Sequence, residues 1–467
     1  MKSLILSVNE YIIRLALIED GKISEFLIED KKDQDYTGNF YKGKIEDVLE
    51  NKENFFINIG LEKNAFLNLG KFKKRQNLYK DADILVQVEK NPRDEKGASV
   101  TLDYSIAGKN IVLLPNSRNI SISNKIKNEK DIDRLKAIFS KVKDVGLIIR
   151  TSASTINENE LQKEYLELLE KWNKILEIYS KSKVGTLIFS QNSIIDRLFR
   201  NYLDESVDEL IVDDEENFNK IKEYVLQKDL KIKINRYFNE RDIFEFYSYN
   251  IDIENALRKK LWLESGAYLV IEKTEALVSI DVNTGRSIEA KNLKELIFKT
   301  NLEAAKEIPR QLRLRNLAGI IIIDFIDMKS ELERKEVLKV LKENLKKDSE
   351  KTEIINYSSL NLVQLTRQRR GKELAAYYLE ECPYCNGTGN IISEDRAILN
   401  LLKELTVISS DVDISGMEVI AKKEFLKKIK QEFSKYIEKI FEKSSVEIKF
   451  SENSSYLVNQ YKINIWK

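Results

Sequence analysis

The chain has 467 residues, of which 42% are hydrophobic and 33% are charged. At roughly 150 residues a domain, this length suggests about three domains and excludes a single small core. The 78 basic and 77 acidic residues leave a net charge of +1, so no overall basic field marks a nucleic-acid partner, and any basic surface must be local.

Histidine is absent from the sequence. Its absence excludes Ser-His-Asp and Cys-His nucleophile pairs, two-histidine ribonuclease sites and imidazole metal ligands. Any hydrolysis must therefore use carboxylates, lysine, tyrosine or a bound metal ion.

The start of the chain and its two cysteines predict a cytoplasmic protein. The apolar run after Met1 is brief, ends at Asn9 and has no small-residue cleavage site, which favours a first β-strand over a signal peptide. Cys382 and Cys385 are too close together to be the disulfide framework of a chain this long. The apolar run 320–323 is far shorter than the roughly 20 residues that cross a bilayer, so we expect no membrane span.

Residues 36–105 alternate short apolar runs with Gly, Asn, Asp and Lys clusters, a pattern typical of a small β-barrel or sandwich. Basic segments lie at 71–75 and 90–93, among the aromatic residues Phe56, Phe66 and Phe72. Basic and aromatic side chains on a small barrel suit single-stranded nucleic acid, whose bases stack on rings while its phosphates meet lysines. Composition alone favours the simpler interpretation that these phenylalanines are core residues.

Apolar residues at helical spacing predict an amphipathic helix over 161–179 and another over 425–441, the latter in a small C-terminal α/β appendage. Between 258 and 380, strands and helices alternate, which predicts a buried sheet flanked by helices. The expected strands are 268–272, 276–281, 319–324 and 352–356, and the expected helices are 292–314 and 331–347. Pro309 should kink or interrupt the first helix, because proline lacks an N–H and crowds the carbonyl four residues earlier.

Two of these strands end in aspartates, Asp281 and Asp324. Ligands gather at the carboxyl ends of strands in an open α/β sheet, so the two carboxylates would converge. A hard divalent cation such as Mg²⁺ would relieve their repulsion and keep waters for a substrate phosphate. Asn283 lies on the same side of the extended chain as Asp281, where its amide would orient that carboxylate or contact the scissile group. Gly285 and Arg286 would add a flexible turn and a cation for phosphate.

A purely structural role is the other interpretation of these acids. Aspartate commonly caps the helix that follows a strand, and for Asp281 or Asp324 alone this role is favoured. For the pair, with both strands aimed at the same edge, the structural and functional interpretations are equally supported.

The segment ECPYCNGTG, from Glu381 to Gly389, has the form of a zinc knuckle. A structural zinc ion takes four ligands, usually Cys or His, and this chain has only Cys382 and Cys385. If zinc binds through sulfur alone, a second chain must supply the other two thiolates, and the ion would join a twofold dimer. The alternatives are an inert turn and a thioredoxin-like redox pair, although Gly387 and Gly389 disfavour the helix start that a redox pair needs.

The concatenation of these motifs closely resembles the ribonuclease E/G family. The resemblance is carried by TEALVSIDVNTG at 274–285, NLEAA at 301–305, RQLRLR at 310–315, IDFIDM at 323–328, TRQR at 366–369 and the cysteine knuckle. Weaker similarity extends over nearly the whole chain.

The resemblance implies an endoribonuclease that cuts single-stranded RNA in rRNA and tRNA processing and mRNA decay, leaving 5′-phosphate and 3′-hydroxyl ends. It implies that Asp281 and Asp324 hold Mg²⁺, assisted by Asn283. The family's RNA-contacting positions in an OB fold are matched by Phe56, Phe66 and Lys96. Its sensor for a 5′-monophosphate is matched by Arg150 and Thr151, with Gly108 and Val112 nearby in the pattern.

The architecture implied by the resemblance is a multidomain α/β protein. A ribonuclease H-like subdomain that lacks that enzyme's active site (1–35 and 188–257) contains an inserted OB-fold barrel (36–105) and a 5′-sensor region (106–187). A DNase I-like catalytic α/β domain (258–378), a zinc link (379–390) and a small C-terminal domain (391–467) follow. Zinc shared through Cys382 and Cys385 would pair two chains, and two such dimers would form a tetramer.

Some positions depart from the family pattern. Lys351 stands where better-studied members have an arginine near the sensor, and Asn124 replaces a basic residue there, so discrimination of the 5′ end would be weaker. The sequence ends at residue 467, without the long disordered tail of larger members. It therefore resembles the shorter, ribonuclease G type, and we expect no degradosome scaffolding through a tail.

Two other functions are alternatives. A catalytically silent RNA-binding or assembly protein would keep the barrel and the zinc link, but it has no need of Asp281, Asp324 and Asn283. A DNA nuclease of similar fold would be distinguished by competition between single-stranded RNA and DNA.

Overall fold

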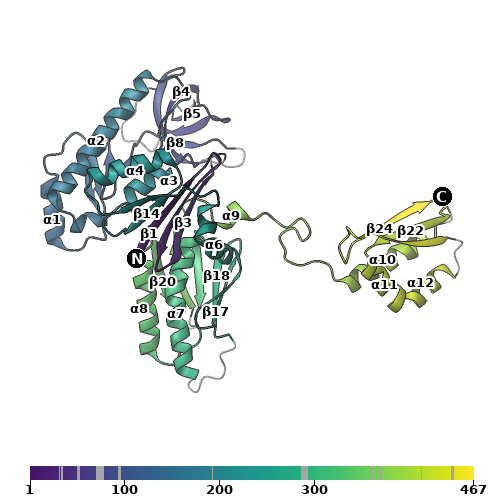
Figure 1. Ribbon diagram of the computed structural model, residues 1–467. Coiled ribbons are helices and arrows are strands. Elements are labelled where there is room, and N and C mark those ends of the chain that lie inside the picture. Colours follow the sequence, from purple (N-terminus) through teal and green to yellow (C-terminus); the bar gives the residue numbers. More distant parts are fainter. Residues whose placement is uncertain are drawn as a thin grey trace. The chain divides into compact units, whose positions relative to one another are not determined.

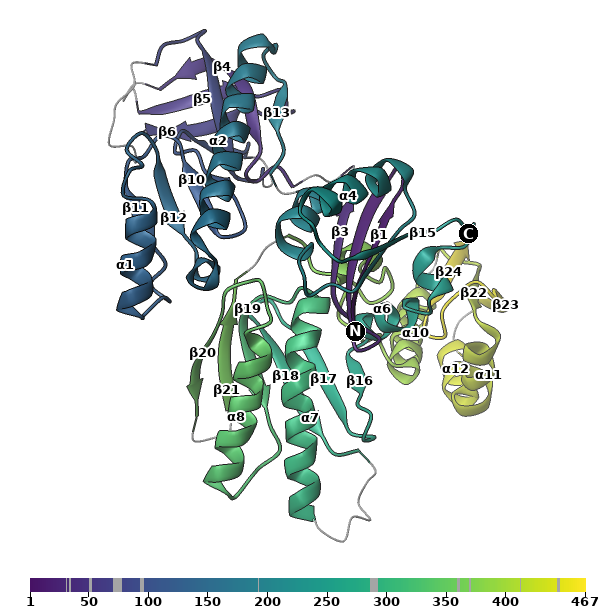
Figure 2. The ribbon, with the colours of Figure 1, turned by 60° about the vertical axis from the view of Figure 1, so that its left-hand side comes forward.

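A computed structural model describes residues 1–30, 32, 35–49, 53–69, 78–92, 96–191, 193–285, 293–358, 362–368, 371–411, 413–442 and 446–467. The chain divides into two compact units, Met1–Tyr378 and Leu379–Lys467 (Figure 1, Figure 2). Within the described ranges, no helix is long and apolar enough to cross a membrane. The basic segment 71–75 with Phe72, Arg93 of the second basic segment, and Arg286 lie outside the described residues.

The N-terminal strands form a five-stranded sheet with two strands from much later in the chain, in the order β15-β14-β1-β2-β3. These strands are β1 (Lys2–Val8), β2 (Ile12–Glu19), β3 (Lys22–Asp30), β14 (Glu209–Val212) and β15 (Lys233–Arg236). Neighbouring β1 residues enter different cores, because successive side chains point to opposite faces of a strand. Leu4 and Leu6 pack with α3 (Ile194–Arg197), the π-helix Leu198–Tyr202 and α4 (Glu215–Gln227), whereas Ile5 packs with α5 (Ile243–Phe246) and α6 (Asn250–Leu257).

The barrel expected within residues 36–105 is present as a closed, OB-like barrel. Its five strands are β4 (Phe40–Val48), β5 (Asn54–Asn58), β6 (Ala65–Asn68), β7 (Asp83–Lys90) and β8 (Ser99–Thr101). Pairing of β4 with β7 closes the barrel, and β13 (Leu187–Phe189) adds to β4 from outside. Alternate residues of each strand fill the interior, so that Phe55 and Ile57 of β5 are buried.

A second small sheet, in the order β11-β12-β10-β9, follows the barrel. Its elements are β9 (Ile106–Ala107), β10 (Ile111–Leu114), β11 (Ile120–Ile122), β12 (Gly146–Ile149), α1 (Glu129–Ile138) and the 3₁₀ helix η2 (Thr151–Thr155). The amphipathic helix predicted at 161–179 is confirmed as α2 (Glu158–Lys181), which begins after the capping residue Asn157. Leu161, Leu168 and Ile175 of α2 share one core with the barrel and this sheet.

The sheet that carries the two aspartates has the order β16-β17-β18-β19-β21-β20. Its elements are β16 (Lys260–Trp262), β17 (Tyr268–Lys273), β18 (Leu277–Asn283), α7 (Leu293–Leu314), β19 (Gly319–Asp324), α8 (Glu331–Leu345), β20 (Thr352–Tyr357) and β21 (Leu362–Arg367). Only β18 and β19 are paired in parallel; the other neighbours are antiparallel. Asp281, Asn283 and Asp324 all lie in this sheet, on β18 and β19.

The described helices flank this sheet on one face, so the expectation of a buried sheet is wrong for its other face. α7 and α8 contact each other and share a core with the inward residues Val278, Ile280 and Val282. The alternate residues point to the other face, where Trp262 is 60% exposed and Ile320 is 53% exposed. Mostly antiparallel strands joined by hairpins need no helical crossover on that face, so the sheet has one covered and one open face.

Pro309 does not interrupt α7, contrary to the prediction. The helix around it is buried, with Ala305, Ile308 and Leu312 fully buried, and α7 also contacts β3 of the N-terminal sheet. Packing on two sides holds the helical path that the missing N–H would otherwise weaken.

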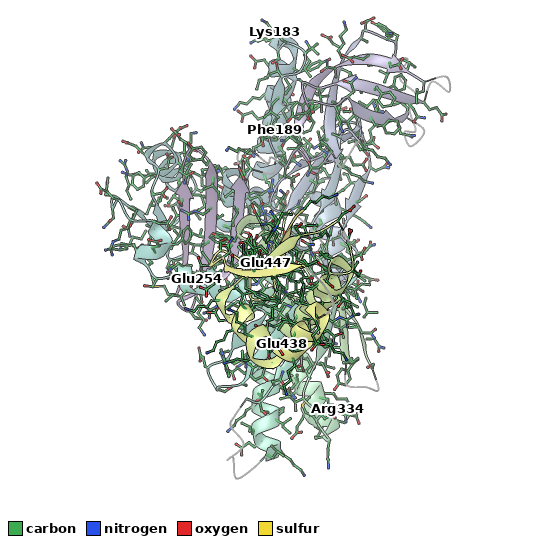
Figure 3. All side chains as sticks on the ribbon, turned by 90° about the vertical axis from the view of Figure 1, so that its right-hand side faces the viewer. Lys183, Phe189, Glu254, Arg334, Glu438 and Glu447 are labelled. Carbon is green, nitrogen blue, oxygen red and sulfur yellow. The ribbon has the colours of Figure 1, made fainter. Side chains whose placement is uncertain are left out.

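The C-terminal unit is a small α/β fold, as expected. Its elements, after the short α9 (Ala375–Tyr378) that ends the first unit, are α10 (Glu394–Ile408), β22 (Gly416–Ala421), α11 (Lys423–Glu432), α12 (Ser434–Phe441), β23 (Glu447–Glu452) and β24 (Tyr461–Trp466). Figure 3 labels Glu438 on α12 and Glu447 on β23. The single helix predicted at 425–441 is two helices, because Phe433 leaves the helical region with φ −122° and ψ 7°.

Candidate active site

Asp281 and Asp324 face each other across the parallel pair of strands at the centre of the sheet. β18 and β19 run from Leu277 beside Ile320 to Asp281 beside Asp324. Directly paired residues project from the same face, and here that face is the open one, because the flanking residues Ile280 and Ile323 are buried. The structure therefore brings together the two acids that the sequence placed at strand ends.

Asn283 lies two residues beyond Asp281 on the same face. Its Nδ2 donates a hydrogen bond of 2.8 Å to Asp281 Oδ2. The bond fixes the amide against the carboxylate and leaves the second Nδ2 hydrogen and the Oδ1 atom for a substrate. Two roles were expected for Asn283, and this hydrogen bond supports the first of them, orientation of the Asp281 carboxylate.

The electrostatics of the pair favour a bound cation. Partial burial, then the negative charge of Asp281, then that of Asp327 raise the pKa of Asp324 above its usual range. A cation between the carboxylates would remove this penalty. Among the described residues no group of three or more acidic or cysteine side chains is placed to hold a metal ion. Two facing carboxylates suit a hard cation such as Mg²⁺, which accepts two carboxylates and keeps several waters.

A fully buried asparagine holds the loop that follows Asp324. Asn301 on α7 donates from Nδ2 to the Ile326 carbonyl (2.8 Å) and accepts at Oδ1 from the Ile326 N–H (3.1 Å). Arg334 on α8 (Figure 3) donates to the Met328 carbonyl at 2.7 Å. Asn301 lies in the NLEAA motif, and an asparagine in the middle of an apolar helix pattern is the sequence signal for this positioning role.

Gly285 lies two residues after the end of β18, the strand that carries Asp281 and Asn283. Its φ is +68°, and a Cβ there would lie 2.2 Å from the Gly266 carbonyl oxygen. The position therefore requires glycine on both counts. Arg286, the expected phosphate contact, lies outside the described residues.

The barrel separates its adjacent phenylalanines into inward and outward positions. Phe55 is 2% exposed in the core, whereas Phe56 and Phe66 are half-buried and directly paired on the other side of their strands. Their ring centroids are 5.8 Å apart. Lys96, the third predicted RNA contact, is exposed just before β8. The simpler interpretation, that Phe56 and Phe66 are core residues, is therefore wrong; the core position belongs to their neighbour Phe55.

A cavity of about 550 Å³ connects the barrel with the predicted sensor. Phe66 of the barrel, Arg150 of the sensor region and Arg200 of the π-helix all line it. Two arginines beside an aromatic ring suit a phosphate attached to a nucleotide. Arg200 was not singled out from the sequence, because its proximity to Arg150 depends on the tertiary fold.

The remaining sensor residues have identifiable local surroundings. Thr151 begins η2, and its hydroxyl lies 2.9 Å from that of Ser123, the residue before Asn124. Gly108 leaves space for Glu164, whose Oε1 would be 2.3 Å from a Cβ at that position. Val112 lies in β10 beside β12. Lys351 lies just before β20, in the sheet that carries Asp281 and Asp324.

The cysteine pair forms a tight turn. The amide of Gly389 donates to Cys385 Sγ at 3.3 Å, and the amides of Tyr384 and Cys385 lower the pKa of Cys382. Both features suit thiolates that bind a metal. Among the described residues, no third His, Cys, Asp or Glu side chain is placed with the two cysteines to complete a metal site.

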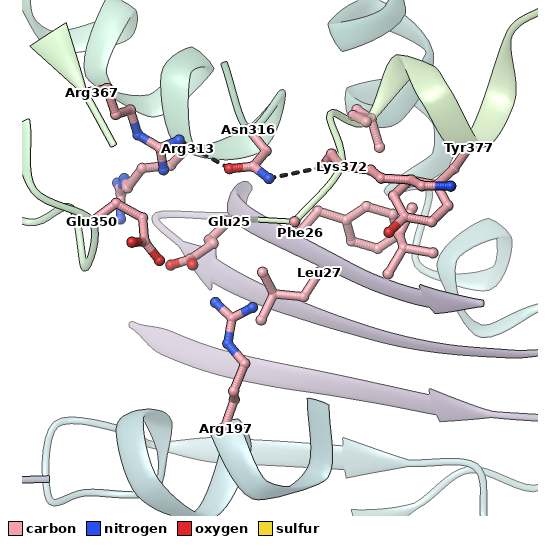
Figure 4. A pocket seen from close by; sticks show the side chains of 13 residues that line it. Glu25, Phe26, Leu27, Arg197, Arg313, Asn316, Glu350, Arg367, Lys372 and Tyr377 are labelled. Atoms are coloured by element: carbon pink, nitrogen blue, oxygen red, sulfur yellow. Dashed lines mark hydrogen bonds between the residues drawn. The ribbon is translucent and has the colours of Figure 1, made fainter. Parts of the chain in front are cut away.

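A second, buried group of charges joins the N-terminal sheet to the aspartate-bearing sheet (Figure 4). Arg367 donates to Asp348 (2.7 Å) and to the carbonyl of Leu317 (3.0 Å), which gives the TRQR motif a structural role. Glu25 of β3 accepts from the Tyr202 hydroxyl at 2.6 Å, and burial raises the pKa of Glu25. Sequence reasoning missed this network, because its members are far apart in the chain.

The chain is similar to known ribonucleases over most of its length. The model of the ribonuclease E/G family matches residues 105–370. Ribonuclease G of Haemophilus influenzae is 35% identical over 424 residues, which cover 86% of each chain. Ribonuclease G of Escherichia coli K12 is 32% identical over 440 residues, 90% of each chain. Ribonuclease E of Buchnera aphidicola is 32% identical over 413 residues, but these cover only 43% of that longer protein.

Proposed function

The chain belongs to the ribonuclease E/G family and is an endoribonuclease; from this premise we propose that it cuts single-stranded RNA with Mg²⁺ held by Asp281 and Asp324. The single observation that carries the proposal is the direct pairing of the two acids on the open face of the sheet, with Asn283 bonded to one of them. A protein that only bound RNA would have no use for this arrangement.

The division of labour follows from the contacts. When bound, Mg²⁺ supplies a Lewis acid that lowers the pKa of water and stabilises charge on a phosphate. Asp281 and Asp324 hold the ion, and Asn283 donates its remaining N–H to an oxygen of the scissile phosphate. Asn301 keeps the loop after Asp324 in place. In-line attack of water on phosphorus then breaks the bond to the 3′ oxygen, leaving a 5′-phosphate and a 3′-hydroxyl.

The barrel and the sensor would select the substrate. Phe56 and Phe66 offer rings to unpaired bases, and Lys96 offers a cation to the backbone. Arg150 and Thr151 would bind a 5′-monophosphate, and the cavity that Arg150 shares with Phe66 supports a continuous path between the two functions. Such an enzyme would act in rRNA and tRNA processing and in mRNA decay.

We also propose that the cysteine turn joins two chains. Cys382 and Cys385 of each chain would supply two thiolates to one Zn²⁺, giving a homodimer, and two dimers would associate as a tetramer. The sulfur-directed amide of Gly389 supports metal binding by this turn.

A cleavage assay tests the proposal. Short A/U-rich RNAs that carry either a 5′-phosphate or a 5′-hydroxyl are incubated with the protein, with and without Mg²⁺. We expect cleavage only with Mg²⁺, faster for the 5′-phosphate. Equal cleavage in EDTA would contradict the metal proposal, and equal rates for the two RNAs would contradict the sensor proposal.

A further inference from the structure

The sheet that carries Asp281 and Asp324, called the catalytic sheet below, has an aromatic pair on its open face, close to the two acids. Trp262 of β16 is directly paired with Tyr268 of β17, which is directly paired with Asn283 of β18. Directly paired residues share a face, so both rings project from the same face as Asn283, Asp281 and Asp324. At about 4.8 Å between strands, Trp262 is roughly 10 Å from Asn283 across the sheet.

A lysine completes the group. Lys260, two residues before Trp262, lies in the row Lys260, Val270, Asp281, Asp324 that crosses the sheet. Its Nζ is 4.1 Å from the centroid of Trp262 and 3.7 Å from that of Tyr268. The two rings are 5.2 Å apart and inclined at 61°. The cation is held in place by the rings, on the side of the sheet where substrate must lie.

Trp262 is not part of the core beneath this sheet. Trp262 stays 60% exposed on a three-residue edge strand, and the residue between it and Lys260, Leu261, supplies the buried contact. A large aromatic surface left accessible beside a cation is the composition of sites that stack single-stranded bases and neutralise their phosphates.

We propose that Trp262, Tyr268 and Lys260 form a base-stacking subsite for a nucleotide of the RNA strand next to the scissile phosphate. The proposal rests on the function proposed above. Trp262 would stack on the base, Tyr268 would hold the indole and Lys260 in position, and Lys260 would meet the adjoining phosphate. The catalytic sheet thus grips the strand at the point of cleavage, independently of the barrel.

The test uses RNAs in which one nucleotide at a time around the cleavage site is abasic. Wild-type protein should lose roughly 5- to 100-fold in kcat/KM when one particular flanking base is missing. Trp262→Ala should lose a similar factor on intact RNA and lose little more on that abasic RNA. Trp262→Phe, which keeps a ring, should restore most of the sensitivity.

Phe238→Ala is the matched control, because Phe238 is 78% exposed with Arg236 over its ring, but follows β15 of the other sheet. It should keep the wild-type profile. The subsite is refuted if Trp262→Ala keeps the full abasic sensitivity, or if it changes the mass of the assembly instead, which would make the surface a contact between copies. Failure of the wild type to cut any RNA with Mg²⁺ would refute the proposed function itself.

Discussion

The barrel and the catalytic sheet use the same strand geometry to present opposite chemistry. In the barrel, β5 buries Phe55 and turns Phe56 outward beside Phe66; in the catalytic sheet, β18 buries Ile280 and turns Asp281 outward beside Asp324. Rings can contact bases without regard to charge, whereas paired carboxylates can hold a metal at a phosphate. We propose that the barrel contributes binding alone, whereas the sheet that carries the aspartates combines the chemistry with a stacking subsite. In both regions, the inward residues stabilise the fold and the outward residues are available for function.

The largest expected effects come from the neighbours Phe55 and Phe56, which test the assignment of inward residues to stability and outward residues to function. Phe55→Ala should destabilise the barrel by about 3–5 kcal/mol, because it empties a core position. Phe56→Ala should destabilise the barrel much less but weaken RNA binding roughly 5- to 100-fold, with kcat retained. Thermal unfolding and fluorescence anisotropy with labelled RNA measure the two effects. Similar behaviour of the two variants would contradict the assignment of faces.

Asn301 tests whether a buried residue can serve the chemistry through position alone. Asn301→Ala leaves the N–H and the carbonyl of Ile326 without partners, at a cost of about 2–4 kcal/mol. We expect kcat to fall while RNA affinity is kept, since the loop after Asp324 loses its support. Asn344→Ala on α8 is the control and should change neither, because the Asn344 side chain donates to the carbonyl of Val340, one turn earlier in the same helix. A loss of RNA affinity alone in Asn301→Ala would contradict the positioning role.

Removal of the two cysteines should change the assembly of the protein without changing the outward surfaces of the barrel or of the sheet that carries the aspartates. The double variant Cys382→Ser, Cys385→Ser should lose zinc and shift toward half the mass of the wild type. Elemental analysis and light scattering measure these changes. Retention of the wild-type mass after zinc is lost would refute the shared site.

Substitution of Asp327 should give the smallest effect, a shift in the pH dependence of the cleavage rate. Its charge contributes to the raised pKa of Asp324, so the ionised form of Asp324 appears at a higher pH than for an ordinary aspartate. Asp327→Asn should lower that pKa and move the acid limb of the cleavage rate to lower pH. The pH profile at fixed Mg²⁺ measures the shift, and movement to higher pH would contradict the electrostatic account.

The sequence was sufficient to predict the barrel, helix α2 and the convergence of Asp281 and Asp324, because each depends on local periodicity or on a strand end. It did not predict the open face of the catalytic sheet, since the pairing of β16 with β17 and of β20 with β21 is antiparallel and is not encoded in the alternation of elements. The apolar strands are equally compatible with one or two helical layers.

Contacts between residues far apart in the sequence could not be predicted either. The buried pair Arg367 and Asp348, and the clamp of Asn301 on Ile326, join segments whose proximity depends on the packed fold. At Pro309 the local rule was correct in principle, but burial of α7 on two sides outweighs it.

The central claim is that the paired carboxylates perform the chemistry while other residues bind RNA, and Asp324→Asn tests it most directly. Single-turnover cleavage and RNA affinity are measured on the same preparation in Mg²⁺. Loss of a metal contact worth several kcal/mol predicts a fall in cleavage on the order of 10³-fold, with the Kd for RNA within about threefold of the wild type. Cleavage at the wild-type rate would contradict the account.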